Sequence, residues 1–172
     1  MDTPTQIKRL ATVSAPAHRH LGADLSNTDW SSMRNALFDL MTERNVQRHV
    51  SMAAPGLDQL AASVAGWLEI EHEVVRPFPD HERPWPAEQA EYARTLVDTA
   101  AEVLTVSDVP RRSAVGLAYK TVVERADALF AIDADDSVIV AHAIENARAR
   151  KIPIFLSRGD DVVTGRYVTI RP

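Results

Sequence analysis

The chain has 172 residues, of which 45% are apolar and 25% are charged, with a formal net charge of −5 and a pI of about 5.6. This length fits one domain with a sizeable core, and the acidic balance excludes a general attraction to nucleic acid or to an anionic membrane. Cysteine is absent, which excludes disulfides, thiolate metal sites and cysteine nucleophiles. No apolar run is long enough to cross a bilayer, and residues 1–8 lack the apolar core of a signal peptide, so we expect a cytoplasmic protein.

The first half of the chain alternates between short apolar segments and longer amphipathic ones. We predict a flexible tail over residues 1–7 and a single domain over residues 8–172. The segments that we predict as strands are residues 8–15, 49–53 and 73–76. The segments that we predict as helices are residues 30–44, 57–68 and 87–100. The side chains expected on the buried faces of the first two helices are Trp30, Met33, Leu37, Leu40, Met41, Leu57, Leu60, Val64 and Trp67.

The second half continues the alternation. The predicted strands are residues 102–107, 128–132, 152–156 and an edge strand at 166–170, and the predicted helices are residues 113–125 and 137–150. Strands that alternate with helices are typical of a parallel sheet with helices on both faces. Because crossovers between parallel strands are right-handed, the pattern predicts an α/β fold in which a mostly parallel sheet forms the middle of a three-layer sandwich.

Several short motifs, in order, resemble one family. They are the strand and turn over residues 8–19, the helix start GLDQLAA at 56–62, the segment VVRPFP at 74–79, the strand DALFAID at 127–133 and the turn KIP at 151–153. Together they are similar to the SLOG superfamily of Rossmann-like domains. That group includes lonely-guy phosphoribohydrolases, the core of DNA-processing protein A and small bacterial nucleotide-sensor domains. The resemblance covers roughly residues 8–156 and implies a Rossmann-like domain with a nucleotide-related ligand.

The chain departs from the family where its members bind phosphate. The glycine-glycine-threonine turn of the family falls here on Val138, Ile139 and Val140, just after the carboxylates Asp133, Asp135 and Asp136. Each such carboxylate within a few ångströms of a phosphate would cost about 1 kcal/mol or more at intermediate dielectric. We therefore expect residues 138–140 to pack rather than to bind phosphate. A ligand phosphate would then lie toward Arg19, Arg76 or Arg111.

The candidate ligand contacts follow predicted strand ends, where parallel sheets bind ligands. They are Arg19, Gly56, Asp58, Arg76, Tyr119 and Asp133. Gly56 permits close backbone approach, Asp58 would bond a ribose hydroxyl, and Arg19 would clamp a phosphate or carboxylate. The resemblance implies that Tyr119 lies near the ligand or a dimer face. The alternatives are a plain helix start at residues 55–58 and arginines that pair with surface carboxylates.

The three carboxylates admit two interpretations. Asp133 and Asp135 are the only candidate catalytic groups, and the cluster would also suit Mg²⁺. The alternative is that Asp135 or Asp136 caps the following helix. We expect no metal and no cofactor, with Mg²⁺ as the one exception that this cluster would allow. Trp85, between two prolines, is a candidate for a loop that covers a pocket or meets a partner.

These observations favour a binding or sensing module for a nucleotide-related small molecule, with weak or no catalysis. We expect a homodimer, and neither nucleic acid nor a membrane as a partner. One alternative is a nucleoside or nucleotide N-glycosidic hydrolase, which would need Asp133 or Asp135 at the anomeric carbon. The other is a structural homodimer with a degenerate pocket.

Overall fold

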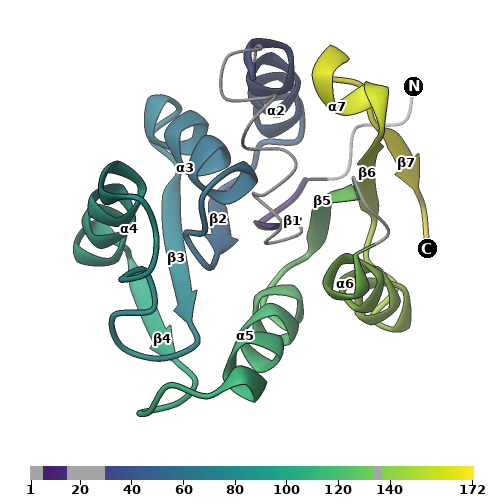
Figure 1. Ribbon diagram of the computed structural model, residues 1–172. Helices are drawn as coiled ribbons and strands as arrows, with labels where there is room; N and C mark the ends of the chain where they lie inside the picture. Colours follow the sequence, from purple (N-terminus) through teal and green to yellow (C-terminus); the bar gives the residue numbers. More distant parts are fainter. Residues whose placement is uncertain (1–5, 15–29, 134–136) are drawn as a thin grey trace.

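A computed structural model describes residues 6–14, 30–133 and 137–172. The first five residues of the predicted tail, the loop that contains Arg19, and the carboxylates Asp135 and Asp136 lie outside this part of the chain. Within it, seven strands form one sheet in the order β4-β3-β2-β1-β5-β6-β7 (Figure 1). Strands β1 to β6 are parallel, and β7 runs antiparallel to β6. The predicted α/β fold with a mostly parallel sheet is confirmed.

The elements follow the predicted order. The first six are β1 (Arg9–Ser14), α2 (Ser31–Glu43), β2 (Arg48–Ser51), α3 (Leu57–Trp67), β3 (Glu71–Arg76) and α4 (Ala87–Thr99). The other seven are β4 (Glu102–Thr105), α5 (Arg112–Glu124), β5 (Ala128–Asp133), α6 (Val138–Ala149), β6 (Ile154–Arg158), α7 (Asp160–Thr164) and β7 (Val168–Ile170). The short helix α7 was not predicted.

Helices cover both faces of the sheet (Figure 1). Helices α5 and α6 pack on one face, against a cluster that includes Ala11 and Val13 of β1. Helices α2, α3 and α7 pack on the other face with Leu10 of the same strand, and α4 lies beside α3. Alternate residues of β1 thus enter opposite layers, as the two-residue period of a strand requires. No helix in the described part of the chain is long and apolar enough to cross a membrane.

Three local expectations differ from the structure. The strand β2 ends at Ser51, before Ala53, whose φ of 57° takes the backbone out of the extended region. Trp67 was expected in the core but is 62% exposed, because the small residues of α3 face the sheet instead. Ile7, placed in the predicted tail, is only 3% exposed, and its amide donates to the Arg44 carbonyl at 3.0 Å.

Candidate functional site

The turn between β2 and α3 lies at the carboxyl edge of the sheet. Gly56 has φ 92° and ψ −123°, a conformation that glycine adopts readily and other residues do not. Helix α3 begins at Leu57, and no hydrogen bond in the described part of the chain uses the amide of Gly56 or of Leu57. The first amides of a helix have no partner within the helix and carry partial positive charge. The turn therefore presents backbone donors.

Asp58 holds this turn from within. Its side chain is 2% exposed and accepts from the amides of Met52 at 3.1 Å and Ala54 at 3.2 Å, and from the Thr12 hydroxyl at 2.7 Å. Burial raises the pKa of Asp58 to about 6, and the three hydrogen bonds act in the opposite direction. The carboxylate predicted to bond a ribose hydroxyl is thus already bound to its own chain.

Thr12 joins Asp58 to a second buried group. Its hydroxyl donates to Asp58, so its oxygen accepts from Nε2 of His49 at 2.9 Å, and the imidazole carries its proton on Nε2. His49 is fully buried, and its Nδ1 has no partner among the described residues. Burial lowers the pKa of His49 to about 3, with a smaller contribution from His72, so the ring is neutral near pH 7. The three side chains form one hydrogen-bonded chain beneath the site.

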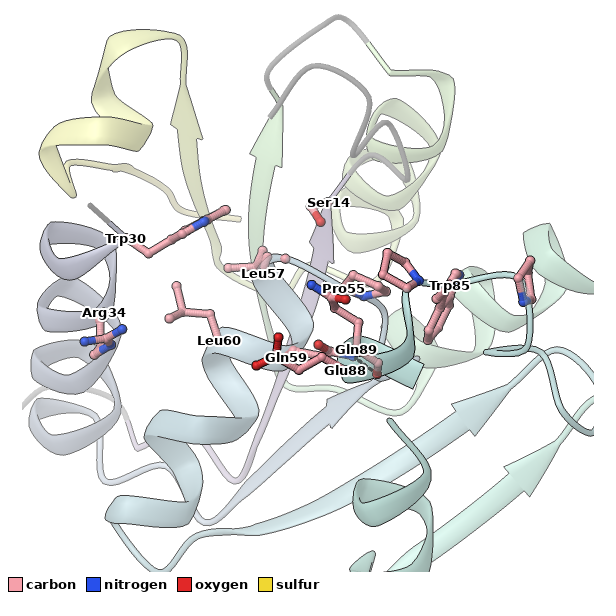
Figure 2. A pocket seen from close by; sticks show the side chains of 13 residues that line it. Ser14, Trp30, Arg34, Pro55, Leu57, Gln59, Leu60, Trp85, Glu88 and Gln89 are labelled. Carbon is pink, nitrogen blue, oxygen red and sulfur yellow. Dashed lines mark hydrogen bonds between the residues drawn. The ribbon is translucent and has the colours of Figure 1, made fainter. Parts of the chain in front are cut away.

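A cavity of about 790 Å³ opens beside this turn (Figure 2). This volume is within the range of small-molecule sites. It lies between the end of β1, the first turns of α2 and α3, and the loop that leads into α4. The lining residues are Ser14, Trp30, Arg34, Pro55, Gly56, Leu57, Gln59, Leu60, Pro84, Trp85, Pro86, Glu88 and Gln89. Figure 2 shows Trp30 and Trp85 on opposite sides of the cavity, with Pro55 and Leu57 between them.

The charges that line the cavity are separated. Among the described residues, Arg34 on α2 is the only cation of the lining and Glu88 on α4 the only anion. The Arg34 guanidinium lies over the Trp67 ring, 5.6 Å from its centroid, and its Nε has no hydrogen-bond partner in the described part of the chain. The cavity is therefore positive on its α2 side and negative on its α4 side.

His81 fixes the loop that carries Trp85. It is 4% exposed, and its Nε2 bonds the Met52 carbonyl at 3.1 Å. The Trp85 ring meets the imidazole edge to face, with centroids 5.0 Å apart. Burial lowers the pKa of His81, which favours the neutral ring. Asp58 binds the amide of Met52 and His81 binds its carbonyl. The loop that carries Trp85 and the turn before α3 are therefore both hydrogen-bonded to the backbone of Met52. Trp85 lines the cavity, as predicted for a pocket loop.

The other predicted site residues lie elsewhere. Gly56 lines the cavity, but Arg76, Tyr119 and Asp133 do not. Arg76 donates from Nε to the Thr105 hydroxyl at 2.8 Å, and Tyr119 is buried in the α5–α6 layer, where burial raises its pKa. Arg19 and Asp135 lie outside the described residues.

Asp133 has a local structural partner on each oxygen. Its Oδ1 accepts from the amide of Ser137 at 3.3 Å, and its Oδ2 pairs with Arg158 at 3.2 Å. Of the residues expected to pack after it, Val140 is buried, whereas Val138 is 70% exposed, so that part of the prediction was wrong. The described residues contain no group of three or more His, Asp or Glu side chains that could hold a metal ion.

Sequence reasoning missed five polar lining residues. They are Ser14, Arg34, Gln59, Glu88 and Gln89. Ser14 ends a strand, which is a signal that could have been used. Arg34 and Gln59 lie inside predicted helices and reach the cavity only because α2, α3 and α4 lie side by side.

The fold and the cavity define a Rossmann-like domain with a candidate ligand site at the carboxyl edge of its sheet. No family model matches the sequence, and no curated protein matches it. Solved structures of similar fold include two of DNA processing protein A. One is DNA processing protein A from Helicobacter pylori, described for its single-stranded DNA binding mode: the TM-score is 0.61 and the identity 15%, over 90% of this chain and 66% of that one. The other is DNA processing protein A from Streptococcus pneumoniae, with a TM-score of 0.51 and 13% identity over 94% of this chain and 62% of that one.

This chain therefore spans just under two thirds of either protein. At these identities the likeness concerns the fold alone. The motifs that resemble the SLOG superfamily predicted this fold, and the similarity to a member of that group confirms it at this level.

Proposed function

We propose that this chain binds a nucleotide-related small molecule in the cavity beside Gly56, with weak or no catalysis. The observation that carries the proposal is the position of the α3 amides. Their residues, Gly56 and Leu57, line a cavity of about 790 Å³ that has a tryptophan on each of two sides. Open α/β sheets bind ligands at this edge, and the amino end of a helix favours an anion.

Each part of such a ligand has a counterpart in the lining. A phosphate would accept from the amides of Gly56 and Leu57 and pair with Arg34. A base would stack on an indole ring, since tryptophan offers a large flat apolar surface. Of the arginines suggested by the sequence, Arg76 already bonds Thr105, and Arg111 lines a separate depression beside Leu117. Arg34 replaces them as the proposed phosphate contact.

Single-stranded DNA is the ligand named for the Helicobacter pylori protein. For this chain the charge favours a small molecule instead. The net charge is −5, and Arg34 is the only cation among the described lining residues, whereas proteins that follow a nucleic-acid backbone present several. We therefore propose a ligand with one or two phosphates rather than a polynucleotide.

Calorimetric titration with adenosine and AMP tests the proposal. We expect AMP to bind and Arg34→Gln to weaken its binding about tenfold, the value of one charge-assisted hydrogen bond, with little change for adenosine. Arg111→Gln is the matched control, because it removes the same charge outside the cavity. Trp85→Ala should weaken both ligands. The proposal is wrong if nucleosides and nucleoside monophosphates neither bind at millimolar concentration nor raise the melting temperature.

The hydrolase alternative requires a carboxylate that is free to act on the sugar. Asp133 is 10% exposed at its side chain and engaged with Ser137 and Arg158, which favours binding without hydrolysis. Incubation with nucleoside monophosphates, followed by chromatography, should release no free base. Release that Asp133→Asn abolishes would restore the alternative.

We also propose that the chain forms a homodimer, and the exposed side chains of one edge strand support this. The edge strand β4 carries Val103, which is 38% exposed, and Leu104, which is 36% exposed, and the neighbouring α5 exposes Leu117 at 48%. An apolar edge strand tends to pair with another strand. We propose that β4 pairs with β4 of a second copy. Sedimentation should show a dimer that Leu104→Lys dissociates, and a monomer at all concentrations would contradict the proposal.

A further inference from the structure

We infer that Gln59 makes the cavity selective for a ligand whose base carries an amino group, as adenine and cytosine do, over the matching base with a carbonyl. The inference rests on the proposed function and adds the chemical class of the ligand. It follows from the orientation of one side-chain amide and from the residues around it.

The orientation of this amide is set by two backbone carbonyls. Gln59 is 9% exposed, and its Nε2 donates to the carbonyl of Ala53 at 3.2 Å and to that of Gln89 at 2.8 Å. An amide nitrogen has two hydrogens, so both are used. The flipped amide would place Oε1 against two carbonyl oxygens, which would repel it. Only one assignment therefore fits the network.

This assignment leaves the amide oxygen as a free acceptor. No described residue donates to Oε1 of Gln59, a residue that is 9% exposed and lines the cavity. This oxygen is not among the buried side-chain atoms that lack a partner, so part of it is accessible to a ligand. A donor on the ligand would supply the missing hydrogen bond.

The surroundings indicate which part of the ligand supplies that donor. Gln89 follows Trp85 by four residues, so the amide of Gln59 bonds the segment that carries an aromatic wall (Figure 2). Glu88, the only anion among the described lining residues, is on the same helix and adds acceptor oxygens. In the proposed function, the phosphate of the ligand would contact the α3 amides and Arg34. A base stacked on Trp85 would thus present its edge to acceptors, which attract an N–H and repel a carbonyl.

Matched ligand pairs test this on the unmodified protein. Calorimetry with AMP and IMP, and with CMP and UMP, compares an amino with an oxo group on each ring, where the adjacent ring nitrogen also changes from an acceptor to an N–H donor. We expect the amino member of at least one pair to bind about tenfold more tightly, as one hydrogen bond to an otherwise unsatisfied group implies. N6,N6-dimethyl-AMP, which lacks both hydrogens, should bind about as weakly as IMP.

A variant then assigns the effect to Gln59. Gln59→Met keeps the length of the side chain but has neither the acceptor nor the donors, and we expect the amino and oxo members to bind within about twofold of each other. Glu91→Gln, an exposed change on α4 outside the cavity, is the control and should preserve the preference. The melting temperature of Gln59→Met reports whether the variant is folded, and if it is not, the ligand pairs on the unmodified protein decide.

The two proposals fail in different ways. If both members of each pair bind equally, or the oxo member binds better, the inference about Gln59 is wrong while the proposed function stands. If no nucleotide of either kind binds, the proposed function fails, and the inference fails with it. If folded Gln59→Met still prefers the amino member of a pair, Gln59 is not the source of the preference.

Discussion

The buried chain of Asp58, Thr12 and His49 predicts two opposite contributions to the pH dependence of stability. The pKa of Asp58 rises from 3.8 to about 6 on folding, so its contribution is complete below pH 3.8 and is lost as the pH rises through about 6. The pKa of His49 falls from 6.5 to about 3, so its contribution is complete above pH 6.5 and is lost as the pH falls toward 3. Each pKa unit corresponds to about 1.4 kcal/mol.

Between pH 4 and 6 the two effects nearly cancel. Over these two units Asp58 contributes about 2 kcal/mol in favour of the lower pH, and His49 about 2–3 kcal/mol in favour of the higher pH. Asp58→Asn leaves only the histidine effect. Relative to the unmodified protein, the unfolding free energy of this variant should therefore fall by about 2 kcal/mol more from pH 6 to pH 4. His49→Gln leaves only the effect of the carboxylate. It should change the difference in unfolding free energy between pH 6 and pH 4 by about the same amount in the opposite direction.

Urea unfolding, followed by tryptophan fluorescence at pH 4, 5, 6 and 7, measures these slopes. The exposed changes Asp98→Asn and His142→Gln are matched controls, because each alters the same residue type outside the buried chain. Their profiles should run parallel to that of the unmodified protein. If the profiles of Asp58→Asn and His49→Gln are also parallel to it, burial does not shift these two groups and the reasoning is refuted.

Three further substitutions should change stability measurably. Glu73 is 1% exposed and pairs with three partly exposed arginines, so Glu73→Gln should lower the unfolding free energy by about 2–3 kcal/mol in urea at pH 7; an unchanged midpoint would contradict this. Gly165→Ala should cost at least about 1 kcal/mol in the same assay, because φ is +67° and a Cβ would lie 2.2 Å from the Ser32 carbonyl oxygen. Gly116→Ala, inside α5 with nothing within 4 Å of the new methyl, should raise stability by about 0.5–1 kcal/mol, seen as a higher melting temperature.

The arrangement of the elements was predictable because it depends on local periodicity. Apolar runs bounded by glycine and proline gave all seven strands, and the spacing of Met33, Leu37 and Leu40 gave the buried face of α2. The sequence pattern placed Trp67 on the buried face of α3, because one large apolar side chain counts more in the hydrophobic periodicity than several small ones. Helix α3 lies close to the sheet through its alanines, and its last tryptophan extends outward over Arg34.

The candidate site was predictable only where the backbone changes direction. Pro55-Gly56 and the prolines around Trp85 are sequence signals for turns, and both segments line the cavity. Arg34 and Gln59 carry no such signal, since each is an ordinary polar residue of an amphipathic helix. Their role depends on contacts of α3 with α2 and with α4, which no local pattern encodes. A tertiary contact, rather than a motif, brings them to the site.

The position of negative charge decides where an anion can bind, and burial decides the effect of each carboxylate. At the start of α6, Asp133 accepts from Ser137 and pairs with Arg158, so it occupies the helix end that a phosphate would need. At the start of α3, Asp58 turns inward and bonds Thr12, Met52 and Ala54. It supports the turn from beneath, and the amides of Gly56 and Leu57 have no hydrogen-bond partner among the described residues. The carboxylates of the two turns therefore have different partners, and of these two helices only α3 begins beside the candidate cavity.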